Sequence, residues 1–108
     1  ARSWGRGAGM EVELMRNNAE EASALLKSLA NPNRLLLLCA LVNREHTVGE
    51  LEMLTGLSQS ALSQHLARLR DEHIVSTRRD AQRIFYALED PGVRAVLETM
   101  HGIYCADN

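Results

Sequence analysis

Apolar residues in the first third of the chain recur at helical spacing. Within residues 13–29 they lie four, three, four and three positions apart, at Met15, Ala19, Ala22, Leu26 and Leu29. This spacing places them on one face of a helix. Asn31-Pro32 then ends the pattern, because Asn is suited to an N-cap and Pro to the first helical position. The apolar run 35–42 predicts a second, buried helix over residues 32–43.

Two short helices separated by a glycine turn are predicted next. Thr47 and Glu50 have the spacing of a capping box for a helix over residues 47–55. Gly56 occupies the usual position just after a helix end. A longer helix over residues 59–72 follows, with an inward face formed by Ala61, Leu62, Leu66 and Leu69.

The hydrophobic period then changes from helical to alternating. Two β-rich runs, 74–78 and 84–88, flank the polar stretch 79–82 and predict a hairpin. Asp90-Pro91 opens a last helix, whose apolar stripe comprises Val93, Val96, Leu97, Met100 and Tyr104. The expected fold is therefore mainly helical, with five helices and a β-hairpin before the last of them.

Length and composition agree with one small helical domain. A chain of 108 residues has no room for a second core, and its 45% hydrophobic content, rich in Leu and poor in aromatics, favours packed helices. No apolar run reaches the roughly 18 residues of a membrane span, and the start lacks the apolar stretch of a signal peptide. We therefore expect a cytoplasmic protein without membrane contact. Residues 1–12 are predicted to be a disordered extension, either native or left from cloning, and residues 13–108 the domain.

Charge is distributed unevenly along the chain. The net charge of −2 argues mildly against a nucleic-acid partner. Residues 58–86, however, hold five Arg and three acidic residues, a balance of +2. Residues 1–57 hold six basic and seven acidic residues, and residues 87–108 hold one and four. A basic segment inside an acidic chain is typical of a localised phosphate-contacting surface.

The two short helices joined by residues 56–58 have the pattern of a helix-turn-helix, which binds DNA through its second helix. Residues 58–67 carry no Lys, Arg, Asp or Glu. Short polar side chains approach base edges closely, Gln can bridge two atoms of adenine, and Ser can bind phosphate. The alternative, an ordinary solvated face, usually carries more Glu and Lys. The candidate DNA-contacting residues of this helix are Ser58, Gln59, Ser60, Ser63, Gln64, His65 and Arg68.

The hairpin tip adds a second polar group. A wing of this kind places its side chains against the DNA backbone or in the minor groove. The alternative is an exposed turn kept soluble by charge. Asp80 is expected to shape the turn rather than to contact DNA. The candidate wing residues are Arg78, Arg79, Gln82 and Arg83. Together the two groups predict a winged helix-turn-helix protein that binds double-stranded operator DNA.

A homodimer is the expected assembly. One helix-turn-helix unit seldom binds specifically enough alone, and dimers usually read two half-sites about 34 Å apart. The first and last helices carry apolar stripes beyond what a small core requires, so they are the predicted dimer surfaces. Alternatively, the same stripes simply cover the core.

The chain resembles the ArsR/SmtB family of bacterial winged-helix repressors over roughly residues 19–105. The resemblance rests on LKSLANPNRLLLLCAL at 26–41, VGELEMLTGLSQSALSQHLARLRDE at 48–72 and VSTRRDAQRIFYAL at 75–88. It implies the helix and hairpin order given above, a homodimer, and release of operator DNA when an inducer, often a metal ion, binds.

The metal sites of that family do not carry over to this chain. The stretch that often holds a Cys-x-Cys motif begins at His46 and has no Cys, and the last helix starts Asp90-Pro91-Gly92 with only His101 later. The four His lie on different predicted elements and lack ligand spacing. We expect no metal site and no cofactor. A metal- or arsenite-responsive repressor and a winged-helix protein-interaction module are the alternatives, and no catalytic constellation indicates an enzyme.

Two cysteines remain, Cys39 in the second helix and Cys105 near the end of the last. A single Cys in an apolar run is commonly a small buried hydrophobe. The pair, however, resembles the cysteines of the thiol-sensing BigR/SqrR/HlyU-like subgroup, which implies a response to sulfane sulfur or oxidants. Thiol chemistry can join two cysteines through a di-, tri- or tetrasulfide. A plain disulfide requires Cα atoms within about 7 Å of each other.

Overall fold

The computed structural model describes residues 11–105 and has the predicted order of elements. Five helices and a hairpin before the last helix are confirmed, and the fold is a winged helix-turn-helix. The elements are α1 (Val12–Leu29), α2 (Pro32–Leu41), β1 (His46–Thr47), α3 (Val48–Thr55), α4 (Gln59–Asp71), β2 (Val75–Asp80), β3 (Arg83–Leu88) and α5 (Pro91–Tyr104).

Four of the five helices have a side-chain cap at their N-terminus. Asn31 accepts hydrogen bonds from two backbone N–H groups of α2, and Asp90 does the same for α5. Thr47 and Glu50 form the predicted capping box of α3, and the Ser58 hydroxyl accepts from the Ala61 N–H of α4. Each cap satisfies N–H groups that have no partner inside the helix. Local sequence therefore sets where these helices start.

The structure contains one strand that the sequence did not predict. The two-residue strand β1 pairs with β3 in antiparallel fashion, so the sheet has three strands in the order β1-β3-β2. Two residues are too few to show an alternating pattern, and the partner strand lies about forty residues further along the chain. The hairpin is also longer than predicted, because its strands extend to Asp80 and Arg83 and leave a two-residue turn.

The core lies where α2, α3, α4 and the start of α5 meet the base of the sheet. Three of the four predicted inward residues of α4, Leu62, Leu66 and Leu69, are buried, and Ala61 is half-buried. Their partners are mainly aliphatic, and the fully buried ones among them are Leu37, Leu38, Leu41, Leu51, Val75, Val93 and Leu97.

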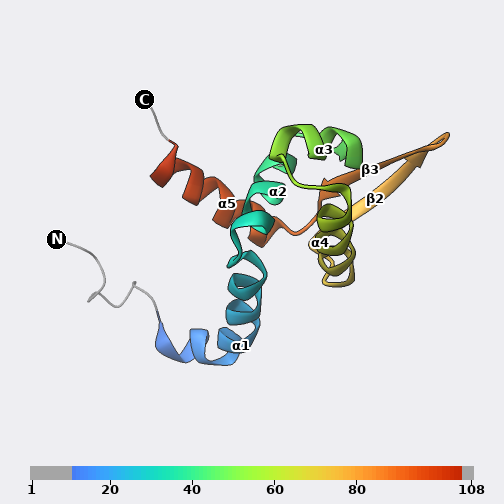
Figure 1. Ribbon diagram of the computed structural model, residues 1–108. Coiled ribbons are helices and arrows are strands. Elements are labelled where there is room, and N and C mark those ends of the chain that lie inside the picture. Colours follow the sequence, from blue (N-terminus) through green and yellow to red (C-terminus); the bar gives the residue numbers. More distant parts are fainter. Residues whose placement is uncertain (1–10, 106–108) are drawn as a thin grey trace.

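Beyond this core the molecule is elongated. Its radius of gyration is 16.3 Å, whereas a compact chain of this length has about 13 Å. Figure 1 shows α1 and the end of α5 projecting on one side of the core and the hairpin on the other. No helix in the described part of the chain is long and apolar enough to cross a membrane.

The predicted N-terminal extension falls largely outside the described residues. Of residues 1–12, only Glu11 and Val12 are described, and they form the N-cap and the first residue of α1. That the rest of the extension is disordered stays a prediction. At the next boundary, α2 ends at Leu41, two residues before the predicted end.

Candidate DNA-binding surface and cysteine groove

The turn between α3 and α4 depends on Gly56. This residue ends α3 with φ of 76°, in the left-handed region that favours glycine. The Thr55 hydroxyl donates to the Leu51 carbonyl and accepts from the Leu57 N–H. These contacts fix the path of the chain into the Ser58 cap, and so the direction in which α4 leaves the turn.

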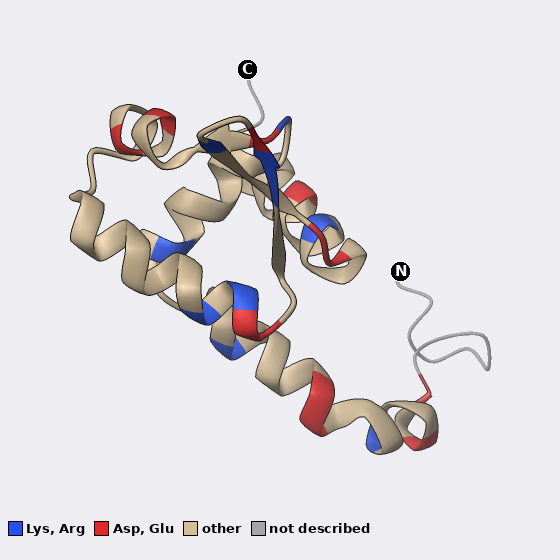
Figure 2. Cartoon of the chain, turned by 90° about the vertical axis from the view of Figure 1, so that its right-hand side faces the viewer, with Lys and Arg blue, Asp and Glu red and all other residues tan. Residues whose placement is uncertain are grey.

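The predicted base-reading side of α4 faces solvent. Ser58, Gln59, Ser60, Ser63 and Gln64 are all exposed. Figure 2 shows that the first turns of α4 carry no charged residue and that the charges gather toward its C-terminal end. These polar groups can therefore approach base edges without breaking an ion pair first.

The last two candidate residues of α4 are more constrained. His65 is half-buried, and burial followed by the charges of Arg34 and Arg68 lowers the pKa of its imidazole. Arg68 is exposed but donates through Nε to Glu72 Oε2 at 3.2 Å. Both residues thus lie at the edge of the open polar face rather than at its centre.

Glu72 connects the end of α4 to the end of α1, a link that the sequence did not indicate. The Ser28 hydroxyl donates to Glu72 Oε1 at 2.6 Å, and this bond is the main cause of the lowered pKa of that carboxyl. Buried Arg34 donates to the Ser28 carbonyl at 2.8 Å. The network fixes the end of α1 against the C-terminal end of α4.

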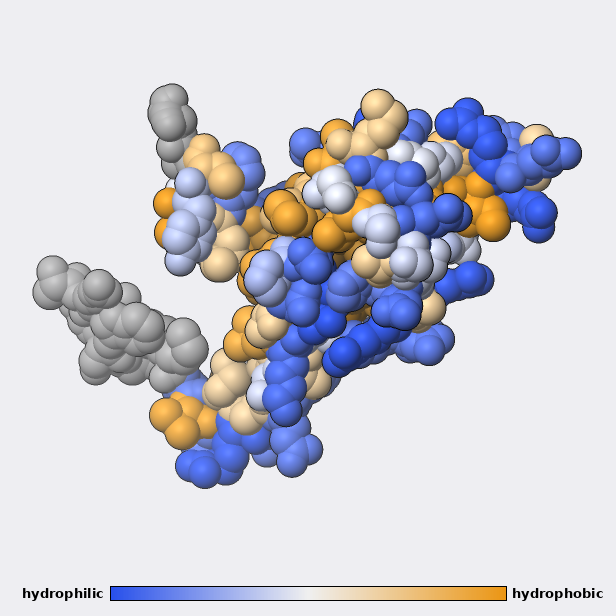
Figure 3. Space-filling view, viewed as in Figure 1, coloured by the Kyte–Doolittle hydropathy of each residue, from blue (hydrophilic) through white to orange (hydrophobic). Residues whose placement is uncertain are grey.

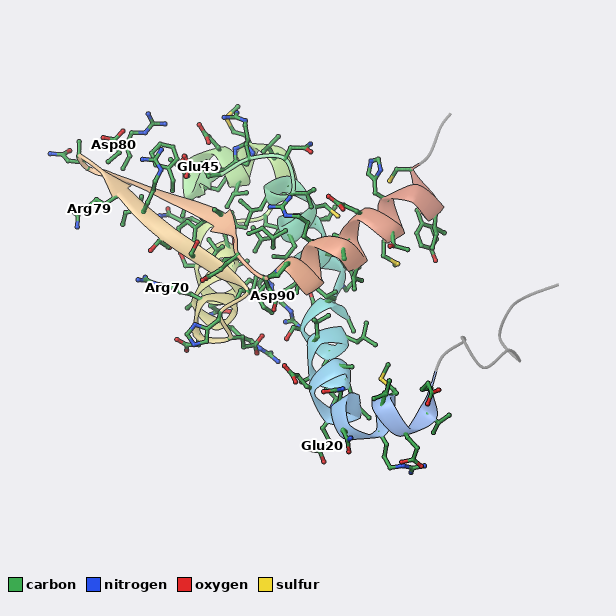
Figure 4. All side chains as sticks on the ribbon, turned by 180° about the vertical axis from the view of Figure 1, so that it is seen from behind. Glu20, Glu45, Arg70, Arg79, Asp80 and Asp90 are labelled. Carbon is green, nitrogen blue, oxygen red and sulfur yellow. The ribbon has the colours of Figure 1, made fainter. Side chains whose placement is uncertain are left out.

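The wing arginines lie on two different faces of the hairpin. Arg78 is directly opposite Phe85 on the neighbouring strand, and Arg83 is two residues before Phe85, so all three side chains share one face. Arg79 is opposite Ile84 and lies on the other face. Figure 4 shows Arg79 and Asp80 at the free end of the hairpin, with Glu45 beside it.

Arg78 and Arg83 are both paired with carboxylates. Arg78 Nε lies 2.9 Å from both carboxylate oxygens of Glu45, and its Nη2 also donates to Glu45. Arg83 Nη2 lies 3.7 Å from Glu50 Oε2. The two guanidinium groups flank the Phe85 ring, with Cζ 4.5 and 4.9 Å from its centroid. Hydrogen bonding to Arg78 is the largest cause that lowers the pKa of Glu45.

Arg79 and Gln82 are the freer wing candidates. Arg79 donates through Nε to the Ala81 carbonyl at 3.2 Å, and within residues 11–105 no carboxylate pairs with it. Gln82 is exposed in the two-residue turn. Ala81, with φ of 58°, takes the left-handed conformation in this turn, whereas Asp80 is the last residue of β2. Asp80 thus directly precedes the turn, and its role in shaping it stays a prediction.

The two cysteines line one groove between α2 and α5. Its volume is about 440 Å³, and both are free thiols. The walls are mostly apolar and comprise Pro32, Leu35, Leu36, Cys39, Met100, His101, Tyr104 and Cys105. Burial, and to a lesser extent the charge of Cys105, raises the pKa of the Cys39 thiol. The structure thus brings together two residues that are 66 positions apart in the sequence.

The histidines do not gather. Buried His46 lies 3.0 Å from Glu50 through Nδ1, and His65 and His73 belong to the α4 region. His101 lines the cysteine groove. Within residues 11–105, no three His, Cys, Asp or Glu side chains form a group that could hold a metal ion.

The chain is similar in sequence and fold to known bacterial regulatory proteins. The sequence pattern described as "Bacterial regulatory protein, arsR family" matches residues 31–77. Transcriptional activator HlyU from Vibrio cholerae is 48% identical over 95% of both chains. The structure of the repressor BigR from Xylella fastidiosa superposes with a TM-score of 0.85 at 43% identity, over 91% of this chain and all of that one. AntR, described as an antimony-specific repressor, superposes with a TM-score of 0.83 at 32% identity, over 95% and 94%.

Proposed function

Because the chain belongs to the ArsR family of bacterial regulatory proteins, we propose that it is a homodimeric repressor controlled by the thiols Cys39 and Cys105. Like its relatives, the chain is a DNA-binding transcriptional regulator and not an enzyme. Regulators of this family bind operator DNA. The proposal concerns the residues that contact DNA, the assembly and the inducer.

The exposed face of α4 is assigned to base reading. Gln59, Ser60, Ser63 and Gln64 are close to the capped N-terminus, where the helix dipole also favours phosphate. Arg79 and Gln82 at the wing tip are assigned to the flanking backbone. The mixed character of this surface, with uncharged readers and few free cations, fits a protein that reads sequence with modest phosphate attraction.

Exposed apolar residues on α1 and α5 support a dimer. Leu14 and Leu26 of α1 are 66% and 56% exposed, and Ile103 and Tyr104 of α5 are 63% and 76% exposed. In Figure 3 hydrophilic side chains cover the free end of the hairpin, whereas hydrophobic ones are visible along α5. Apolar surface on two projecting helices is typical of an interface that a second copy covers. Light scattering should give twice the mass of the chain.

The observation that carries the inducer assignment is the shared groove of Cys39 and Cys105. A thiolate at one cysteine attacks the outer sulfur of an organic persulfide and releases the organic thiol, leaving a protein persulfide. The second thiol then attacks the inner sulfur of that persulfide, forming the disulfide and releasing hydrogen sulfide. If both cysteines are first persulfidated, their condensation gives a trisulfide and one hydrogen sulfide. With peroxide, a sulfenic acid condenses with the second thiol and releases water.

A bridge between α2 and α5 offers a route to the DNA-binding surface. Cys39 belongs to the core helix α2, and Cys105 is the C-cap of α5, whose outer residues are assigned to the dimer interface. Joining them restricts how α5 leaves the core, and hence the distance between the recognition helices of the two copies. A spacing that no longer matches successive major grooves weakens operator binding.

The test exposes the reduced protein to an organic persulfide, hydrogen peroxide, Zn²⁺ and antimonite in parallel. Intact mass and affinity for a duplex that the protein selects from a random pool are followed together. Persulfide should add sulfur or remove two hydrogens and weaken binding, and Cys39→Ser and Cys105→Ser should each abolish the bridge. Unchanged mass and affinity with persulfide would overturn the assignment.

The antimonite and Zn²⁺ arms address a second candidate, a metalloid- or metal-responsive repressor. The likeness to AntR favours including it. In that case antimonite or Zn²⁺ alone should bind stoichiometrically and release DNA, and Cys39→Ser should prevent this only if the thiols are ligands.

A further inference from the structure

The outer face of the hairpin carries a layered cluster that the base-reading role does not require. Phe85 lies at its centre, between Thr47 of β1 and Arg78 of β2. The Arg78 side chain crosses this ring to reach Glu45, just before β1. Arg83 flanks the same ring toward Glu50 of α3. Glu45, just before β1, and Glu50, in the first turn of α3, thus each supply a carboxylate to one of the two outer arginines.

The pair between Arg78 and Glu45 has the stronger geometry of the two. Arg78 uses two of its nitrogens on one carboxylate, and its guanidinium stacks on an aromatic ring. Bidentate, charge-assisted contacts of this kind are the strong class of hydrogen bond. The Arg78–Glu45 pair is nevertheless half-exposed, with 53% and 33% of the side chains accessible, so phosphate can reach it.

We propose that Glu45 limits the sequence-independent DNA affinity of this regulator by occupying Arg78 in place of a phosphate. A paired arginine adds no net charge, so it releases no counterion from DNA unless the pair opens. Sequence-independent affinity comes almost entirely from such phosphate contacts, each adding about 0.9 to the salt slope. The inference rests on DNA binding by the wing and not on the thiol switch.

The experiment measures DNA affinity of Glu45→Gln, which keeps the size of the side chain and removes its charge. The probes are a duplex selected by the wild-type chain from a random pool and a scrambled duplex, each titrated at several salt concentrations. Glu45→Gln should bind both duplexes about eightfold more tightly at 0.1 M salt and steepen the salt slope by about 0.9. The ratio between the two affinities should stay the same, because phosphate contacts carry no sequence information.

Two further variants separate this effect from simpler ones. Glu89→Gln makes the same change in net charge at an exposed position at the other end of the hairpin, and it should have a much smaller effect. Arg78→Gln should cost little in the wild-type background but about eightfold in the Glu45→Gln background. The proposal is overturned if Glu45→Gln binds more weakly, if it matches Glu89→Gln, or if Arg78→Gln costs the same in both backgrounds. Absence of DNA binding by the wild-type chain would instead refute its proposed function.

Discussion

The first turns of α4 and the hairpin are both exposed and polar, yet their polar groups are partnered differently. On α4 the candidate readers are uncharged, and the Ser58 hydroxyl is used for capping. On the hairpin, two of three candidate arginines are held by Glu45 and Glu50. One surface is ready to form hydrogen bonds, and the other has most of its charge already compensated.

This difference separates two functions of DNA-binding surfaces, the discrimination between sequences and the attraction to any duplex. Hydrogen bonds to base edges discriminate between sequences, whereas cations attract any duplex. This chain has a net charge of −2, and most of its wing cations are compensated by carboxylates. It therefore gains little affinity from sequence-independent attraction to the DNA phosphates. Its affinity should therefore depend more on the base readers than on charge, and the following experiments test that balance.

The largest effect is expected at the base readers. Gln59→Ala and Gln64→Ala each remove a side chain that can bridge two atoms of a base, which should cost about 1–3 kcal/mol, or roughly five- to 150-fold, on the selected duplex. Binding to a scrambled duplex should change little. Fluorescence anisotropy with both duplexes measures this, and equal losses on both would mean that these residues do not read sequence.

A smaller, uniform effect is expected from the wing. Arg79→Gln removes the wing cation that has no carboxylate partner in the described part of the chain. Affinity at 0.1 M salt should fall about eightfold for selected and scrambled duplexes alike, and the salt slope should decrease by about 0.9. A change confined to the selected duplex would contradict the assignment of Arg79 to the backbone.

Loss of the Ser58 cap of α4 should lower the stability of the fold without changing its charge. Ser58→Ala removes the acceptor for the Ala61 N–H and should lower the free energy of unfolding by about 1 kcal/mol, whereas Ser58→Gly should cost less in capping. Urea denaturation of both variants gives the comparison. Equal stability of Ser58→Ala and the wild type would show that the cap is dispensable.

The smallest effect concerns pH. The pKa of Glu45 is lowered by Arg78, so the ion pair is complete above the ordinary carboxyl range and is lost as pH falls through the lowered pKa. Arg78→Gln should move the Glu45 titration, followed by NMR, back toward the ordinary value for glutamate. An unmoved midpoint would indicate that the pair does not persist in solution.

Local sequence determined the elements and most of their boundaries. The helix caps and the glycine that ends α3 contact only residues a few positions away, so the local sequence is enough to predict them. They are Asn31, Thr47, Ser58, Asp90 and Gly56. The inward face of α4 follows in the same way from its helical period. The exposed position of the polar readers is the complement of that face.

Only the tertiary structure decided how distant residues meet. Four features join positions 33 to 66 residues apart in the sequence. They are the short strand β1, the pairing of Glu45 with Arg78, the hydrogen bond from Ser28 to Glu72 and the shared groove of the cysteines. No local pattern encodes such pairs, because each depends on how helices and strands pack after they form. The candidate readers could thus be named from the sequence, whereas the restraint on the wing arginines required the folded chain.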